Sequence, residues 1–88
     1  KIRSNLNYNF FRSERMCRRI RDLREDYDLT QEYLAKYLSC SQSAYSKIEA
    51  GKRQLSIDYL IKLSSLYRVS TDYLLGLTDY PYRYKKLQ

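Results

Sequence analysis

The sequence contains no histidine and no tryptophan, and its 88 residues include only two glycines, one proline and two cysteines. A metal site needs about four nitrogen or sulfur ligands, and Cys17 and Cys40 form no C-x-x-C pair. We therefore expect neither a metal nor another cofactor. Without histidine or a recognisable acid–base constellation, we do not expect an enzyme either. The two thiols are expected to be reduced and half-buried, as in a cytoplasmic protein.

Other absences limit the fold. Two glycines and one proline are too few for the many turns of an all-β protein. No apolar run approaches the ~20 residues that a membrane-spanning helix needs, and there is no signal-peptide pattern. The length suits one domain with a modest core. Charged residues make up 31% of the chain among good helix formers, which favours an all-α fold.

The net charge of +7 lies mostly at the two ends of the chain. Residues 1–13 contribute +3, residues 80–88 contribute +3, and the 66 residues between them contribute only +1. A basic excess is typical of proteins that bind nucleic acid. Because the excess lies at the ends, it also fits a solvated surplus of charge. The net charge alone therefore does not distinguish a nucleic-acid-binding protein from one with solvated, basic ends.

Residues 29–53 are the most informative stretch, because they predict two short helices joined by a tight turn. The hydroxyl of Thr30 can cap the first helix, and that of Ser41 can cap the second. Gly51 is expected to end the second helix, since glycine adopts the left-handed conformation at little cost. Apolar residues recur at helical spacing in both segments: Leu34, Ala35, Leu38, Ala44, Tyr45 and Ile48.

Three more helices are expected around this pair. The first begins at Ser13, and a second begins after Ser56. A short third helix, residues 71–75, begins after Ser70 and ends at Gly76. The apolar face of the first helix consists of Met16, Ile20, Leu23 and Tyr27. The helix after Ser56 has a wider stripe, which predicts the most buried helix of the domain: Ile57, Leu60, Ile61, Leu63, Leu66 and Tyr67.

The two ends of the chain are harder to interpret. Residues 1–12 are expected to form a loose arm. The tail places Tyr80, Tyr82 and Tyr84 around Pro81, alternating with basic residues. Three interpretations of the tail remain open: a folded extension that packs on the domain, a disordered segment, or a direct DNA contact.

An ordered set of residues in the middle of the chain carries a family resemblance. In the helix pair these residues are Thr30, Gln31, Leu34, Ala35, Leu38, Ser41, Gln42, Ile48, Glu49, Gly51, Lys52 and Arg53. Outside it they are Ile20, Leu23, Arg24, Leu60, Leu63, Leu66, Val69, Ser70, Tyr73, Leu74 and Leu75. Together they resemble the lambdoid-repressor family, also called the Cro/repressor or xenobiotic-response-element (XRE) family. The sequence departs from the family at Tyr45, which is more often a β-branched aliphatic residue, and at Ser39, which is often glycine.

The resemblance implies an all-α, five-helix lambda-repressor-like DNA-binding domain with a helix-turn-helix. It covers residues 14–77. The expected organisation is an N-terminal arm of residues 1–13, the DNA-binding domain of residues 14–77, and a basic, Tyr-rich C-terminal tail of residues 78–88.

The second helix of the pair is expected to read DNA. The major groove of B-DNA admits one α-helix, and the base edges there present distinct donors and acceptors. The family resemblance implies base contacts at Gln42, Ser43, Ser46 and Lys47. It implies phosphate contacts at Gln31, Ser41, Lys52 and Arg53. For Tyr45 two interpretations stay open: a phosphate contact through its hydroxyl with the ring in the core, or core packing alone.

Arg24 and Glu49 are implied to have a structural role. In the family a similar arginine on the first helix pairs with a similar glutamate at the end of the recognition helix. If buried, such a pair would lock the recognition helix onto the first helix. The alternative is two unrelated surface charges.

The function implied by the resemblance is sequence-specific regulation of transcription. We expect a bacterial or phage-encoded, cytoplasmic and nucleoid-associated repressor that binds double-stranded DNA. A homodimer on a palindromic operator is expected, because one such helix reads only a few base pairs. An antitoxin or restriction-modification controller that regulates its own synthesis fits equally well. The rival from another class is a protein-interaction module that keeps the fold without binding DNA.

The chain after Ser70 is the expected dimer surface. It lies beyond the two helices that are expected to read DNA, and tyrosine is enriched at protein interfaces. The arm before Ser13 is the next candidate for this surface.

Overall fold

The computed structural model describes the backbone of residues 2–82 and the side chains of residues 14–82. Its elements are α1 (Ile2–Asp26), α2 (Gln31–Leu38), α3 (Gln42–Glu49), α4 (Ile57–Tyr67) and α5 (Thr71–Leu75), with no strand in this part of the chain. The five-helix, all-α prediction is confirmed. No helix within residues 2–82 is long and apolar enough to cross a bilayer.

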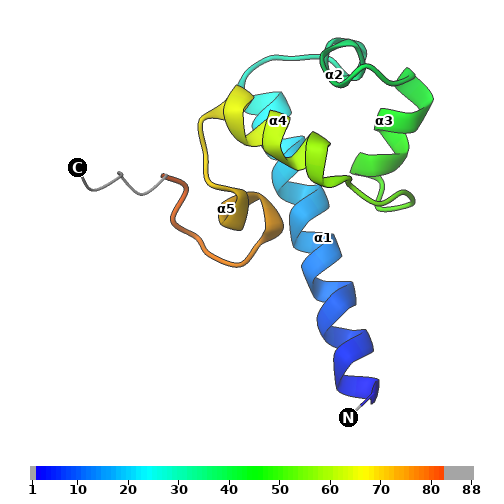
Figure 1. Ribbon diagram of the computed structural model, residues 1–88, viewed down its shortest axis with the longest axis vertical. Coiled ribbons are helices and arrows are strands. Elements are labelled where there is room, and N and C mark those ends of the chain that lie inside the picture. Colours follow the sequence, from blue (N-terminus) through cyan, green and yellow to red (C-terminus); the bar gives the residue numbers. More distant parts are fainter. Residues whose placement is uncertain (1, 83–88) are drawn as a thin grey trace.

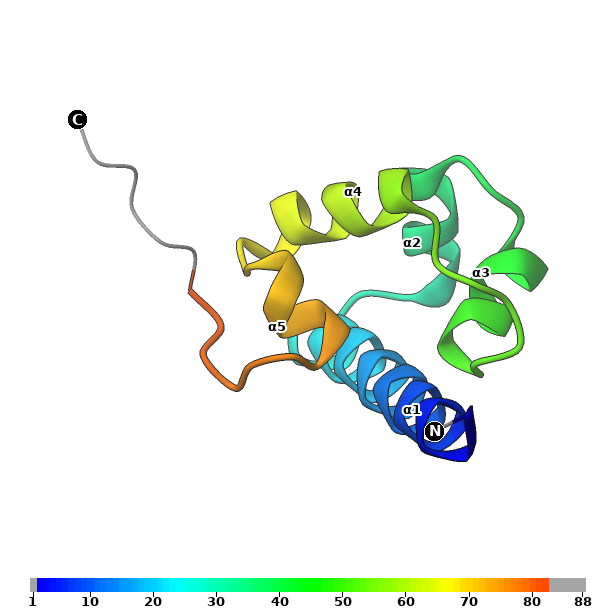
Figure 2. The ribbon, with the colours of Figure 1, turned by 60° about the horizontal axis from the view of Figure 1, so that its bottom comes forward.

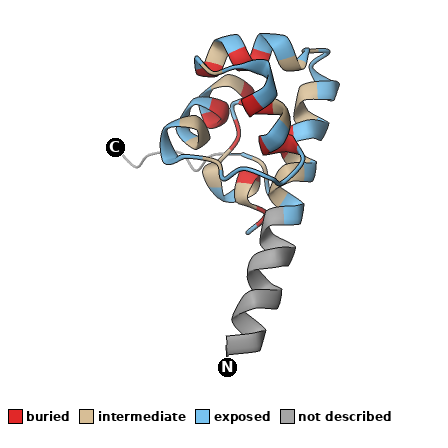
Figure 3. Ribbon diagram, turned by 90° about the vertical axis from the view of Figure 1, so that its right-hand side faces the viewer, coloured by how far each residue is buried: buried red, intermediate tan, exposed pale blue. Residues whose placement is uncertain are grey.

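The helices surround one core. The C-terminal half of α1 lies between α3 on one side and α5 on the other, and α4 crosses the molecule in front of α1 (Figure 1). Each of the five helices contributes at least one buried residue, and these are coloured red in Figure 3. The apolar residues that fill this core are Ile20, Leu34, Ala35, Leu38, Tyr45, Leu63, Tyr67, Val69 and Leu74.

Serine and threonine caps set the start of four helices, as predicted. Thr30 accepts a hydrogen bond of 3.0 Å from the backbone N–H of Tyr33 at the start of α2. The hydroxyls of Ser41, Ser56 and Ser70 make the same contact at α3, α4 and α5. Each cap satisfies one of the backbone donors that the first turn of a helix leaves unpaired.

The expected start of α1 is wrong. The helix begins at Ile2 rather than at Ser13, which lies inside it. No glycine or proline interrupts residues 1–26, and extending an existing helix is far easier than nucleating one. The predicted arm is therefore helical rather than loose, and its first turns project beyond the other helices (Figures 1 and 2). The boundary between an arm and a domain at residue 13 stays a prediction.

The prediction that the fourth helix is the most buried is also wrong. Leu63, Ser64 and Tyr67 of α4 are buried, but the side chains of Ile57 and Ile61 are 74% and 54% exposed. Both isoleucines lie on the outer side of a stripe that is wider than the core can cover. A hydrophobic stripe gives the width of an apolar face, but its burial depends on what packs against it.

The segment after α5 folds back onto α1 and α5. Gly76 ends α5 with φ of 80°, and its carbonyl accepts a hydrogen bond of 3.2 Å from Arg15. Further along, the backbone N–H of Ser70 donates to the carbonyl of Pro81 across 2.9 Å. Of the three interpretations of the tail, packing on the domain holds for residues 77–82. Tyr84 lies outside the described residues.

Arg19 of α1 holds the segment after α5 in place through several hydrogen bonds. Its guanidinium donates to the carbonyls of Tyr73 and Thr78 and lies 2.5 Å from the carboxylate of Asp79. The same guanidinium sits 4.0 Å from the ring centroid of Tyr73. One side chain of α1 therefore connects α5 with the chain that follows it.

Candidate nucleic-acid interface

The helix pair forms a compact right-hand corner of the molecule in Figure 1, and α3 is its outer helix. Ser39 ends α2 in the left-handed conformation, with φ of 60°. Its backbone N–H donates to the carbonyl of Lys36 across 3.1 Å, and that of Cys40 donates to Ala35 across 2.9 Å. Serine thus makes the turn where the family often has glycine.

The helix α3 has one buried and one open side. Ala44, Tyr45, Ile48 and Glu49 face the interior. The residues expected to contact bases lie on the other side: Gln42, Ser43 and Lys47 are exposed, and Ser46 is half-buried. The open side therefore offers an amide, hydroxyls and an ammonium group. These groups match the donors and acceptors of base edges, and the base contacts themselves stay predictions.

Three of the expected phosphate contacts are accessible. Ser41 is exposed at the start of α3, where helix N-termini favour anions. Lys52 and Arg53 are exposed in the loop after α3, and neither forms an ion pair within residues 14–82. Two exposed cations directly after α3, without an ion pair in the described part of the chain, suit a polyanionic partner.

Gln31 is only partly available to a phosphate. Its side-chain amide donates one of its two N–H groups to Oε1 of Glu49 across 3.1 Å, so the side chain is held by a contact inside the protein. Its backbone N–H lies in the first turn of α2, where such groups have no partner within the helix. A phosphate contact at Gln31 is therefore expected through the backbone.

The structure contradicts the phosphate contact suggested for Tyr45. The side chain is 0% exposed, and its hydroxyl donates to Oε2 of Glu49 across 2.6 Å. The ring fills the core between α3 and its neighbours, and the hydroxyl is directed to an internal carboxylate rather than to solvent. Of the two interpretations, core packing is the one that the structure supports.

Glu49 is the centre of a buried polar network. Nε of Arg24 lies 2.6 Å from its Oε2, and Nη2 lies 3.2 Å from its Oε1. The side chains are 14% and 4% exposed, so the implied ion pair is present and buried. Nη1 of Arg24 also donates to the carbonyl of Leu29 across 2.9 Å. Together with Gln31 and Tyr45, this network ties α1 and α2 to the end of α3.

The network fixes the protonation states of its members. Burial alone would raise the pKa of Glu49, but hydrogen bonds from Arg24, Tyr45 and Gln31 outweigh it and hold the pKa below its ordinary value. Burial and the hydrogen bond to Glu49 raise the pKa of Tyr45. Glu49 is therefore an ionised acceptor and Tyr45 a neutral donor near neutral pH.

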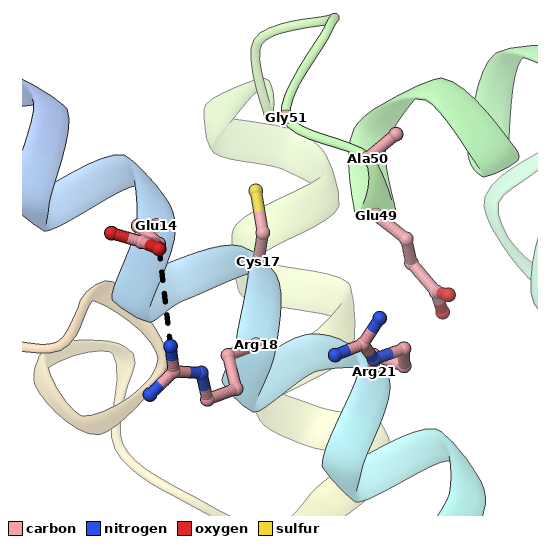
Figure 4. A pocket seen from close by; sticks show the side chains of 7 residues that line it. All are labelled: Glu14, Cys17, Arg18, Arg21, Glu49, Ala50 and Gly51. Atoms are coloured by element: carbon pink, nitrogen blue, oxygen red, sulfur yellow. Dashed lines mark ion pairs between the residues drawn. The ribbon is translucent and has the colours of Figure 1, made fainter.

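A pocket lies between α1 and the C-terminal end of α3 (Figure 4). Cys17 projects into it, and its thiol donates to the carbonyl of Ile48 across 3.3 Å. Burial, followed by the charge of Glu49, raises the pKa of Cys17, which keeps the thiol protonated and weakly nucleophilic. Cys17 and Cys40 are both free thiols. Within the described side chains, no cluster of three potential metal ligands occurs.

Sequence reasoning missed two members of the Glu49 network. Tyr45 precedes Glu49 by four residues, so the two share a helix face, and this spacing could have revealed their contact. The contact between Gln31 and Glu49 joins two helices through the turn between them. Spacing along the chain gives no signal for it.

Known proteins with similar sequences are named as HTH-type transcriptional regulators. Of the curated relatives, the HTH-type transcriptional regulator YobD of Bacillus subtilis, described as uncharacterized, is 45% identical over 65 residues, which are 74% of this chain and 58% of that protein. The HTH-type transcriptional regulator ImmR of the same organism is 41% identical over 59 residues, 67% of this chain and 46% of that protein. The chain thus spans about half the length of these relatives.

A third relative is the regulator YonR of Bacillus subtilis, described as SPbeta prophage-derived and uncharacterized. It is 35% identical over 57 residues, 65% of this chain and 53% of that protein. No solved structure gives a significant match. A family model described as helix-turn-helix matches residues 20–74, which include all of α2, α3 and α4. The chain therefore belongs to the Cro/repressor-type (XRE) helix-turn-helix family.

Proposed function

We propose that this protein is a sequence-specific regulator of transcription that binds double-stranded DNA through α3. The observation that carries the proposal is the contrast between the two sides of this helix. Its inner side is fixed by the Glu49 network, and its outer side presents exposed Gln42, Ser43 and Lys47. Base readout requires polar groups on a rigid support. Membership of a family of transcriptional regulators supports the same conclusion.

In this proposal the residues divide into two roles. Base edges are contacted by Gln42, Ser43, Ser46 and Lys47 of α3. Phosphates are contacted by Ser41, Lys52 and Arg53, together with the backbone N–H of Gln31. Base contacts supply specificity, whereas phosphate contacts supply affinity and orientation.

The proposal extends to repression by a homodimer on a palindromic operator in the bacterial cytoplasm. One α3 reaches only a few base pairs, and two copies related by a two-fold axis read a site long enough to be selective. Two recognition helices would then lie about 34 Å apart, one turn of DNA. Occupying such a site in or near a promoter excludes the transcription machinery.

The near-neutral charge of residues 14–79 favours a second candidate, a protein-interaction module. These residues carry only +1 of the total charge of +7. An exposed amide and hydroxyls on α3 suit a protein surface as well as a DNA groove.

Selection from a random pool of DNA duplexes with the full 88-residue chain distinguishes the two candidates. We expect enrichment of a palindrome. Gln42→Ala should change the enriched sequence, whereas Lys36→Ala, on the exposed side of α2, serves as the control and should not. Enrichment of an asymmetric site would contradict the dimer. No enrichment at all would contradict sequence-specific binding and favour the interaction module.

A further inference from the structure

Two apolar side chains stand out on the surface of the domain. Ile57 and Ile61 of α4 are 74% and 54% exposed, and they are one helical turn apart. Residues at this spacing lie on the same side of a helix. Figure 2 shows α4 along the upper edge of the molecule, with no described segment over its outer side. The two isoleucines therefore form an apolar row that the domain itself does not cover.

A charged row runs beside the apolar row. Asp58 and Lys62 are also four residues apart, and both are exposed. Neither forms an ion pair with another side chain in residues 14–82. The outer face of α4 therefore has two parallel rows, one apolar and one with an acid nearer the N-terminus and a base nearer the C-terminus.

This pattern is complementary to itself in one orientation. Consider two α4 helices that pack antiparallel about a two-fold axis perpendicular to both helices. In this arrangement the apolar row of one helix lies opposite the apolar row of the other, and the charged row lies opposite the charged row. Ile57 and Ile61 then meet the isoleucines of the second copy. Because the helices run in opposite directions, Asp58 lies opposite the Lys62 of that copy. A parallel pair would instead bring the apolar row of each helix against the charged row of the other.

We propose that the outer face of α4 is the surface on which two copies of this chain dimerise, with Ile57 and Ile61 at the centre and two Asp58–Lys62 ion pairs at the side. This inference rests on the proposed function, because it supplies the two-fold axis that a palindromic operator requires. It differs from the expectation that the chain after Ser70 forms the dimer surface. In that segment the backbone at Thr78 and Pro81 is held against α1 and α5 by Arg19 and Ser70, whereas Leu77, Tyr80 and Tyr82 remain exposed.

The small area of the α4 surface indicates that the dimer is weak in the absence of DNA. A stable interface buries about 800 Å² on each partner, and two isoleucines with their flanking charges provide only part of that. The free dimer is therefore weak, and an operator that holds both copies stabilises it through effective concentration.

Charge reversal tests the orientation. Asp58→Lys places a second lysine opposite Lys62 in both contacts, and Lys62→Asp places two acids together. Each single variant should raise the dissociation constant of the dimer by about tenfold or more, as like charges replace ion pairs. A mixture of the two single variants restores opposite charges at both contacts and should form heterodimers with nearly the original affinity. The readout is sedimentation equilibrium of the full chain without DNA.

The apolar row is tested by Ile61→Asp, with Leu77→Asp as the matched control. Leu77 is 49% exposed and lies outside α4, so both changes place a charge at an exposed apolar position. Ile61→Asp should abolish dimerisation at concentrations where Leu77→Asp leaves it unchanged. Thermal unfolding of each variant shows whether the domain remains folded. If Ile61→Asp does not fold, the mixture of the two charge variants still tests the proposed surface.

The outcomes separate this inference from the proposed function. Equal dimerisation of both charge variants and the original chain, or no recovery in the mixture, overturns the α4 surface. A chain that selects only a single, asymmetric half-site overturns it too and leaves DNA binding intact. A chain that dimerises as described but selects no sequence supports the α4 surface and overturns the proposed function.

Discussion

The hydroxyl of Tyr45 donates to Oε2 of Glu49 across 2.6 Å, from one turn earlier on the same helix. The same oxygen accepts a hydrogen bond from Nε of Arg24, also 2.6 Å long. A β-branched aliphatic residue, the more common choice of the family at position 45, could not donate to the carboxylate. The aromatic residue therefore adds a polar contact to the lock between α1 and α3 while its ring fills the core.

Tyr45→Phe should destabilise the domain with little change in its packing. The ring remains, but Glu49 loses one of its donors while still buried. Hydrogen bonds to charged groups contribute about 1.5–3 kcal/mol, and urea unfolding should show a decrease in this range. Tyr33→Phe, at a 46% exposed position, is the control and should change the unfolding free energy little.

Arg24→Ala should be more damaging. Removing one partner of a buried ion pair costs about 3–5 kcal/mol, because the other charge is stranded. For a domain of this size that is a large part of the total stability, so the melting temperature should fall strongly. Arg21→Ala, at an exposed position of the same helix, should have little effect. Equal melting temperatures for the two variants would contradict the structural role of Arg24.

The stability of the domain should fall in acid because of Glu49. Its pKa is lower in the folded protein than its ordinary value of 4.5, so the unfolded chain binds this proton more readily. The stabilisation that Glu49 provides is complete above the pKa of Glu49 in the unfolded chain. It is lost as the pH falls through the pKa of Glu49 in the folded protein. Urea unfolding between neutral pH and about pH 3 should show this loss, which begins near the ordinary pKa of 4.5.

Glu49→Gln should weaken this acid dependence, although it also destabilises the domain at neutral pH. The comparison is therefore between slopes of unfolding free energy against pH rather than between absolute values. Glu32→Gln, whose side chain is 68% exposed, should keep the original slope. If Glu49→Gln keeps it as well, another carboxylate determines the acid sensitivity.

Ser39→Gly should stabilise the protein. Ser39 has φ of 60°, and the left-handed conformation costs a residue with a side chain about 1–2 kcal/mol. Glycine avoids this strain but loses about 0.5–1 kcal/mol in backbone entropy, which leaves a net gain of up to about 1.5 kcal/mol. Ser43→Gly, inside α3, should have the opposite sign. Thermal unfolding of both variants provides the measurement.

Gln42 and Arg53 should affect DNA binding in different ways. Gln42→Ala should reduce discrimination at one base pair of each half-site by about 1–3 kcal/mol, the value of a good bidentate contact. Its affinity for a scrambled duplex should hardly change. Arg53→Ala should weaken binding to both duplexes about equally, and should reduce the slope of affinity against salt by about 1 for each lost phosphate contact.

Fluorescence titrations of the two variants on a selected operator and a scrambled duplex, across a series of salt concentrations, measure both effects. The assigned roles are wrong if Gln42→Ala weakens both duplexes alike. They are also wrong if Arg53→Ala changes only the operator.

Local signals in the sequence predicted most of the fold. The hydroxyls of Thr30, Ser41, Ser56 and Ser70 mark helix starts because a cap depends only on the next three residues. The start of α1 could not be predicted in the same way. Ser13 has the chemistry of a cap, but a capping residue is also tolerated inside a helix when no glycine or proline stops the chain before it.

The features that could not be predicted depend on packing between distant segments. The apolar stripe of α4 does not reveal that the side chains of Ile57 and Ile61 are exposed. Nothing in the sequence near Arg19 indicates that it holds the chain at Thr78 and Asp79. The resemblance to a family pointed to the contact between Arg24 and Glu49, whose separation of 25 residues leaves no local signal.

The Glu49 network also determines how α3 can open. An eight-residue helix has little stability in isolation, since isolated helices shorter than about 12–15 residues are marginal in water. Donors from α1 and α2 converge on its last residue, so α3 cannot fray from its C-terminal end while those helices stay in place. The hydrogen-bonded amide protons in the C-terminal half of α3 should therefore exchange with solvent mainly when α1, α2 and α3 unfold together as one cooperative unit. The surface proposed to read DNA exists only while that unit is folded.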